Sequence, residues 1–166
     1  MKDNQRKCVF AGTFDPPTLG HKAVVDDCLQ MFDEVVVAML VNRQKQPFFS
    51  VEQRKKMWEL MYPQTPALKI VTFEGTVAEL LKKENTNIYV RGIRNGVDLD
   101  YENDNFYASK KLNDQLITLY LPCRQELLHI NSTMVRNSLA FGTPIDEYVT
   151  KAVREYIEDI YTKERS

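Results

Sequence analysis

The sequence predicts an α/β fold with a five-stranded, mainly parallel, doubly wound sheet and helices on both faces. Three observations predict it. Short apolar runs alternate with stretches of helical periodicity along the chain. Residues 35–41 are apolar without a break, which is typical of a strand buried on both faces. A glycine-containing turn at residues 12–17 joins the first strand to the first helix, as in a right-handed crossover unit.

The first half of the chain supplies two strands and two helices. The apolar run at residues 8–11 predicts the first strand, and a helix begins near Thr18. That helix has apolar residues at helical spacing, namely Val25, Cys28, Leu29 and Phe32. Residues 34–41 form the second strand. The sequence Ser50-Val51-Glu52-Gln53 reads as a capping box that opens a helix to about Met61.

The third and fourth strands are shorter. We expect the third at residues 68–73, followed by a helix that Thr76 and Glu79 cap. Residues 87–90 form the fourth strand, and residues 91–96 form a loop.

The last elements are a strand and three helices. We expect a helix at residues 99–112 and the fifth strand at residues 116–121. Asn131-Ser132-Thr133 caps a helix to about Phe141, and Asp146 caps a final amphipathic one. In parallel sheets ligands bind beyond the carboxyl ends of the strands. The loops after the first, second, fourth and fifth strands can therefore converge on one site.

Composition limits the class of protein. A length of 166 residues predicts a single domain spanning residues 1–166. The 22 basic and 23 acidic residues give a net charge of −1, so no basic field for nucleic acid exists. No apolar window approaches the ~18 residues of a membrane span, and Met1–Lys7 is too polar for a secretory signal. Three widely spaced cysteines predict reduced thiols in a cytoplasmic protein.

The stretch Gly12–His21 is the strongest candidate site. A loop that enters a helix N-terminus gathers backbone N–H groups and the positive end of the helix dipole, which suits an anion. Gly12 allows a close approach to a bulky ligand, and Pro16-Pro17 stiffens the loop. His21 falls in the first helical turn, where it can face the same anion. The alternative is an ordinary strand–turn–helix junction with a structural histidine.

Basic residues follow two other strands. Lys45 lies in the polar loop after the second strand, and Arg91 and Arg94 lie on either side of Gly92 in the loop directly after the fourth strand. Arginine pairs grip phosphate with forked hydrogen bonds. The alternatives are a solvated loop for Lys45 and, for the arginines, a helix-capping pair or surface ion pairs with Asp98 and Asp100.

Two further segments have both ordinary and functional interpretations. Ser132 and Thr133 are common helix caps, and their hydroxyls would also cradle a triphosphate. The acidic alternation Asp98, Asp100, Glu102 and Asp104 places favourable charge at a helix N-terminus. Its i, i+2 spacing spreads carboxylates around a helix, which does not fit a metal cage.

The motifs together resemble a known family. Gly-Thr-Phe-Asp-Pro with Thr-x-Gly-His, then Arg-Gly-x-Arg with Asp-x-x-Tyr-Glu, then Ile-x-Ser-Thr-x-x-Arg, follow one another along nearly the whole chain. This order resembles the bacterial phosphopantetheine adenylyltransferases, of the nucleotidylyltransferase superfamily with a (T/H)xGH motif. The resemblance implies a Rossmann-like fold and transfer of AMP from ATP to 4′-phosphopantetheine, giving dephospho-coenzyme A. It also implies magnesium with ATP, feedback binding of coenzyme A, and a homohexamer.

The resemblance also implies residue roles. His21, Lys45 and Arg94 correspond to catalytic positions. The positions that correspond to ATP contacts are Thr13, Phe14, His21, Gly92, Ile93, Arg94, Glu102, Leu127, Leu128, His129, Ile130, Asn131, Ser132 and Thr133. Those that correspond to acceptor contacts are Thr13, Lys45, Thr76, Val77 and Arg91. The sequence departs from the family at Thr76-Val77, where two large apolar residues are usual, and at the polar helix positions Asn105 and Ser109.

Two other functions fit parts of the pattern. Ser-Thr-Met-Val-Arg at residues 132–136 also resembles the late motif of nicotinamide mononucleotide adenylyltransferases, which use a different acceptor. A non-catalytic nucleotide-binding regulatory module would need neither His21 nor Lys45, and the presence of both favours an enzyme.

Overall fold

The computed structural model of the chain describes residues 5–164 and contains one parallel five-stranded sheet. The strands are β1 (Lys7–Gly12), β2 (Glu34–Leu40), β3 (Leu68–Phe73), β4 (Ile88–Ile93) and β5 (Ile117–Pro122), paired in the order β3-β2-β1-β4-β5. The predicted doubly wound parallel sheet is confirmed. The strand order reverses between β1 and β4, which is where such folds bind ligands.

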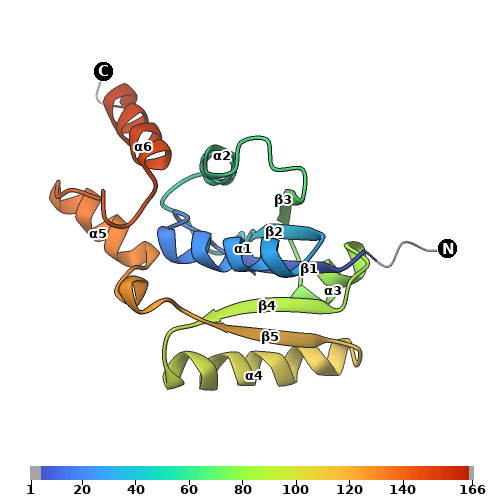
Figure 1. Cartoon of the computed structure of the whole chain (residues 1–166). Helices are drawn as coiled ribbons and strands as arrows, with labels where there is room; N and C mark the ends of the chain where they lie inside the picture. The colour runs from blue at the N-terminus through green and yellow to red at the C-terminus, as the bar shows by residue number, and fades with distance from the viewer. Residues whose placement is uncertain (1–4, 165–166) are drawn as a thin grey trace.

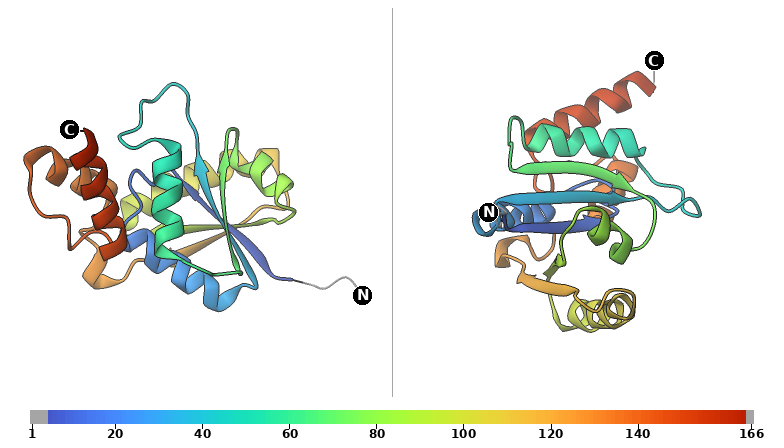
Figure 2. Two further views of the ribbon diagram at one scale, coloured as in Figure 1. Left: turned by 90° about the horizontal axis from the view of Figure 1, so that it is seen from above. Right: turned by 90° about the vertical axis from the view of Figure 1, so that its right-hand side faces the viewer.

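Helices cover both faces of the sheet (Figure 1). They are α1 (Leu19–Met31), α2 (Val51–Met61), α3 (Val77–Lys83), α4 (Gly96–Leu112), α5 (Ser132–Phe141) and α6 (Lys151–Glu164), with a 3₁₀ turn η1 (Gln125–Leu127) before α5. Seen from above in the left panel of Figure 2, α1 lies on one side of the strands and α3 and α4 lie on the other. None of the helices between residues 5 and 164 has the length and apolar character that a membrane span requires.

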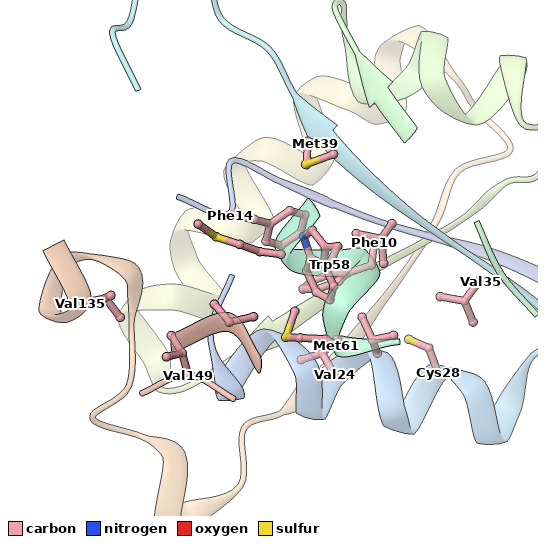
Figure 3. Packing of buried hydrophobic residues seen from close by; sticks show 14 of the residues in the cluster. Phe10, Phe14, Val24, Cys28, Val35, Met39, Trp58, Met61, Val135 and Val149 are labelled. Carbon is pink, nitrogen blue, oxygen red and sulfur yellow. The ribbon is translucent and has the colours of Figure 1, made fainter. Parts of the chain in front are cut away.

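Successive side chains of β1 point to opposite faces of the sheet, and helices cover both faces. Cys8 and Phe10 pack into a core cluster with buried residues of α1, α2 and α6, whereas Val9 and Ala11 pack with α3. All four side chains are buried, which is why the strand reads as a continuous apolar run. Figure 3 shows the first cluster, with Trp58 of α2 at its centre.

Several element boundaries differ from the sequence prediction. Strand β4 continues to Ile93, so Arg91 and Gly92 lie in the strand and not in a loop. The cause is pairing, because β5 matches β4 in register as far as Ile93 and Pro122. Helix α4 starts earlier than expected, at Gly96, behind an Asn95 cap.

The last helix starts later than predicted. It begins at Lys151, where the Thr150 hydroxyl accepts from the Val153 amide. Asp146 does not cap it. The Asp146 carboxylate forms an ion pair with Arg154.

Gly92 of β4 faces Val24 of α1, and this contact gives a stability prediction. A Cβ at Gly92 would lie 2.9 Å from Cγ2 of Val24. We expect Gly92→Ala to destabilise the protein by about 1–3 kcal/mol, the usual range for overpacking. Gly96→Ala is the matched control, because a Cβ there meets nothing within 4 Å. Urea unfolding followed by the fluorescence of the single tryptophan, Trp58, measures both. Equal stabilities of the two variants would contradict the prediction.

Candidate active site

A cavity of about 1010 Å³ lies at the carboxyl edge of the sheet. Its origin is a separation of the central strands: β1 and β4 pair only at Val9↔Tyr89 and Phe10↔Val90. One residue further along, the Arg91 guanidinium takes the place of a strand partner and donates to the Ala11 carbonyl at 2.6 Å. Figure 1 shows α5 and the start of α1 at this same edge. The volume is at the upper end of the range for small-molecule sites, roughly 300–1,000 Å³.

The structure brings most of the predicted site residues together. Those that line the cavity are Thr13, Phe14, His21, Lys45, Arg91, Gly92, Arg94, Glu102, Ile130, Asn131 and Ser132. The others lie outside its lining, namely Thr76, Val77, Ile93, Leu127, Leu128, His129 and Thr133. The loops after β1, β2 and β5 and the end of β4 therefore meet at one place, as the parallel topology predicts. Segments more than 100 residues apart touch there, since the Ser132 hydroxyl donates to the Pro16 carbonyl at 2.7 Å.

Three guanidinium groups bind alternate carbonyls, the first at the end of β1 and the other two in the β1–α1 loop. Arg91 donates to Ala11, Arg54 donates to the Thr13 carbonyl at 2.6 Å, and Arg136 donates to the Asp15 carbonyl at 2.6 Å. This arrangement neutralises the carbonyl dipoles and leaves excess positive charge around the loop.

Sequence reasoning gave no role to Arg54 or Arg136, although both line the cavity. Each left a signal. Arg54 is a charged residue at helical spacing from the buried Met57, Trp58 and Met61, so it had to be buried on the same helix face. Arg136 is the last residue of the Ile-x-Ser-Thr-x-x-Arg motif.

Phe14 has an unusual backbone. Its φ of 49° lies in the left-handed region, which costs a bulky residue about 1–3 kcal/mol. The ring offsets this by packing edge-on against Trp58, at 5.1 Å between centroids, and against His21, at 4.9 Å. Figure 3 shows Phe14 next to Trp58. The loop conformation is therefore held by the core.

His21 is part of the cap of α1 as well as of the cavity wall. Its Nδ1 accepts from the Thr18 amide at 3.1 Å, and its own amide donates to the Thr18 hydroxyl at 3.4 Å. Burial lowers the pKa of His21 to about 3, and the positive charges of Arg91 and Arg94 act in the same direction. The ring is therefore neutral at pH 7. Since Nδ1 is the acceptor, Nε2 carries the proton and is the donor available to a ligand.

The low pKa gives a pH prediction. In the unfolded chain His21 has an ordinary pKa near 6.5, so the unfolded state binds more protons between pH 6.5 and 3. The stability contributed by neutral His21 is full above that window and is lost as the pH falls through it. We expect nitrogen NMR shifts of His21 to remain those of a neutral ring at pH 5. A protonation midpoint near 6.5 in the folded protein would contradict the assignment.

Two ion pairs hold Arg91, which lies in β4, and Arg94, which directly follows β4. Arg91 Nη2 lies 2.7 Å from Oε1 of Glu102, which is buried, and Arg94 Nε lies 3.0 Å from Oδ2 of Asp98. The Asp98 carboxylate also accepts from the Arg94 amide, and Arg94 lowers the pKa of Asp98. Glu102 and Asp98 thus orient guanidinium groups at the cavity wall.

The electrostatics of the cavity suit a polyanion. Its lining includes six basic side chains, which are Arg43, Lys45, Arg54, Arg91, Arg94 and Arg136, against three acidic ones, which are Asp15, Asp98 and Glu102. First-turn residues of α1 and α5 also border it, so two helix N-termini add positive potential.

The three acidic side chains do not form a magnesium cage. Asp15 accepts from two backbone amides, Asp98 pairs with Arg94, and Glu102 pairs with Arg91. Within residues 5–164, no group of three or more His, Cys, Asp or Glu side chains is arranged to hold a metal ion. Magnesium often binds through substrate phosphates with few protein ligands, and that mode needs no cage.

Comparisons with known proteins identify the family. A family described as cytidylyltransferase-like matches residues 9–138. A phosphopantetheine adenylyltransferase of Flavobacterium johnsoniae is 35% identical over 149 residues, covering 90% of this chain and 97% of the relative. One from Lachnoclostridium phytofermentans is 31% identical over 158 residues, covering 95% and 97%.

A solved structure shares the fold. It is a nicotinic acid mononucleotide adenylyltransferase of Plasmodium falciparum complexed with NaAD, with a TM-score of 0.68 over 96% of this chain and 98% of that one. The two sequences are 18% identical, so the likeness concerns the fold alone.

Proposed function

We propose a specific reaction for this chain, which belongs to the cytidylyltransferase-like family of nucleotidyltransferases: it transfers AMP from ATP to 4′-phosphopantetheine. The products are dephospho-coenzyme A and pyrophosphate. One observation carries the choice of acceptor. Relatives at 31–35% identity over at least 90% of the chain are named phosphopantetheine adenylyltransferases. The cavity, with its excess of basic side chains, supports a reaction between two phosphorylated ligands.

The chemistry requires charge control more than proton transfer. An oxygen of the acceptor phosphate attacks the α-phosphorus of ATP, a new P–O bond forms, and the bond to the pyrophosphate leaving group breaks. The nucleophile is already an anion, so no general base is needed. The protein must hold two repelling anions in line and stabilise the charge that gathers on the α-phosphate.

The residues of the cavity divide these tasks in the proposal. His21 donates its Nε2–H to an oxygen of the reacting phosphate, a bond that strengthens as charge develops there. Lys45 and Arg91 hold the acceptor phosphate, and Arg94 lies along the pyrophosphate. Ser132, at the N-terminus of α5, contributes to the ATP phosphate site. Magnesium enters with the substrate as Mg²⁺–ATP.

His21 acts in this proposal as a neutral donor and not as a cation, because burial keeps its pKa low. The positive charge then comes from Lys45 and the arginines that line the cavity. The hydrogen bond from His21 can therefore be stronger in the transition state than in the ground state, without making ATP itself bind too tightly.

A pyrophosphate-release assay tests the proposal. Purified protein is given Mg²⁺–ATP with 4′-phosphopantetheine or with nicotinamide mononucleotide, each in turn. We expect release only with 4′-phosphopantetheine, together with a product of the mass of dephospho-coenzyme A. Release with nicotinamide mononucleotide alone would assign the other acceptor. Tight ATP binding without turnover of either acceptor would indicate a regulatory module.

The family resemblance extends the proposal to assembly and regulation. We propose a cytoplasmic homohexamer that binds coenzyme A as a feedback ligand. Sedimentation velocity at micromolar concentration measures the first property, and a monomer there would contradict it. Competition of coenzyme A with ATP, measured by calorimetry, addresses the second.

A further inference from the structure

The loop that carries Lys45 has few contacts of its own. Residues 43–48 between β2 and α2 are exposed. Two of its hydrogen bonds are local, because the Gln44 and Lys45 amides donate to the side-chain and main-chain oxygens of Asn42. Arg43 pairs with Glu74 at 2.8 Å, but both side chains are largely exposed, so this pair adds little order.

The carboxyl end of the loop is held by Asp15. This side chain is only 7% exposed. Its Oδ2 accepts from the Phe48 amide at 2.7 Å, and its Oδ1 accepts from the Phe49 amide at 2.9 Å. Both oxygens of one buried carboxylate thus accept hydrogen bonds from consecutive amides of another loop, 33 and 34 residues away.

Two arginines fix Asp15 and its partner segment in turn. Arg136 donates to the Asp15 carbonyl, as described above. Arg54, which is 3% exposed, donates to the carbonyls of Thr13 and Phe49. The β1–α1 loop that carries the phosphate site and the loop that carries Lys45 are therefore tied together by one carboxylate and one guanidinium.

We propose that Asp15 is a positioning residue for Lys45: its carboxylate, through the Phe48 and Phe49 amides, fixes the position of the Lys45 loop at the cavity wall. This deepens the proposed function and rests on it, since it assumes that Lys45 holds the acceptor phosphate. A carboxylate oxygen accepts each amide by a charge-assisted bond. An asparagine of the same shape presents an N–H to one of those amides, so one bond becomes a donor–donor contact.

The effect of Asp15 is expected on the acceptor and not on ATP in general. Lys45 is exposed, and the other contacts of its loop are local or exposed to solvent. Loss of the Asp15 bonds to the Phe48 and Phe49 amides therefore lets the Lys45 ammonium group occupy many positions. The α1 and α5 N-termini are held by other bonds, which stay in place: the Thr18 amide donates to His21 Nδ1, and the Met134 amide donates to Asn131 Oδ1.

The first test needs no substrate. Amide hydrogen exchange is compared in wild type, Asp15→Asn and Ser50→Ala. We expect the Phe48 and Phe49 amides to exchange at least tenfold faster in Asp15→Asn. Ser50→Ala is the matched control, because it removes the α2 cap next to the loop and leaves the Asp15 bonds intact. Unchanged exchange at both amides in Asp15→Asn would overturn the proposal whatever the acceptor is.

The second test is a double-mutant cycle with Lys45→Ala. We expect Asp15→Asn to raise the KM for 4′-phosphopantetheine about tenfold, with ATP affinity changed less than threefold. In the Lys45→Ala background the same change should have almost no further effect, because Asp15 acts through Lys45. Independent, multiplying losses, or an equal loss of ATP affinity, would overturn the proposal and assign Asp15 a general structural role. If the wild type does not turn over this acceptor, the proposed function fails. The exchange experiment still shows whether Asp15 holds the Phe48 and Phe49 amides.

Discussion

Replacing His21 by asparagine is expected to lower kcat by about 10²–10³-fold while the fold and ATP affinity are retained. This is the scale of loss when one preorganised donor to a developing negative charge is removed. The asparagine Oδ1 can occupy the position of Nδ1 and accept from the Thr18 amide, so the helix cap survives. What disappears is the Nε2–H donor.

Comparison with His21→Ala separates the catalytic role of His21 from its role in the helix cap. It removes the donor and also the acceptor of the Thr18 amide, so it should lose the same factor in kcat and a further ~1 kcal/mol of stability. Steady-state kinetics, calorimetry with a non-hydrolysable ATP analogue and thermal unfolding separate the two effects. If His21→Asn keeps turnover within about threefold of wild type, the histidine is a capping residue and takes no part in the reaction.

Replacing Arg91 by alanine is expected to damage the fold as well as the acceptor site. The guanidinium pairs with the buried Glu102 and holds the Ala11 carbonyl. Removing one partner of a buried pair leaves an uncompensated charge, which costs about 3–5 kcal/mol. Because the Arg91 side chain keeps a quarter of its exposure, we expect about 2–3 kcal/mol, or a fall in Tm of roughly 5–10 °C.

The double variant Arg91→Ala/Glu102→Gln identifies the source of that loss. Neutralising the stranded carboxylate should restore part of the stability, since the unpaired charge no longer has to be buried. Acceptor affinity should stay low in both variants, because the guanidinium that grips the phosphate is absent from each. If the double variant is no more stable than the single one, the ion pair is not the source of the cost. Full acceptor affinity in both would remove Arg91 from the proposed site.

The two predictions concern residues whose function and structural role overlap. His21 is both a cap and a donor, and Arg91 is both a strand partner and a candidate phosphate ligand. Paired substitutions are needed in each case, because a single alanine variant would confuse a loss of folding with a loss of chemistry.

The sequence by itself determined the class of fold and the location of the candidate site. Continuous apolar runs such as residues 35–41 and capping patterns such as Ser50–Gln53 depend on neighbours only a few residues away. Such local patterns can be read without knowledge of the tertiary structure. The motif Gly12–His21 combined a strand end with a helix start, and parallel topology alone places such a junction at the ligand edge. The single-domain assignment and the residue roles stay predictions.

Only the tertiary structure decided which strands are neighbours, where β4 ends and what Arg54, Arg136 and Asp15 bind. Arg91 and Gly92 lie in β4 because β5 pairs with them, and β5 lies about thirty residues further along the chain. The two amides bound by Asp15 are more than thirty residues from it, and the carbonyl bound by Arg136 is 121 residues away. Such bonds form only after the chain closes long loops around a common core, so the sequence pattern does not identify the partners.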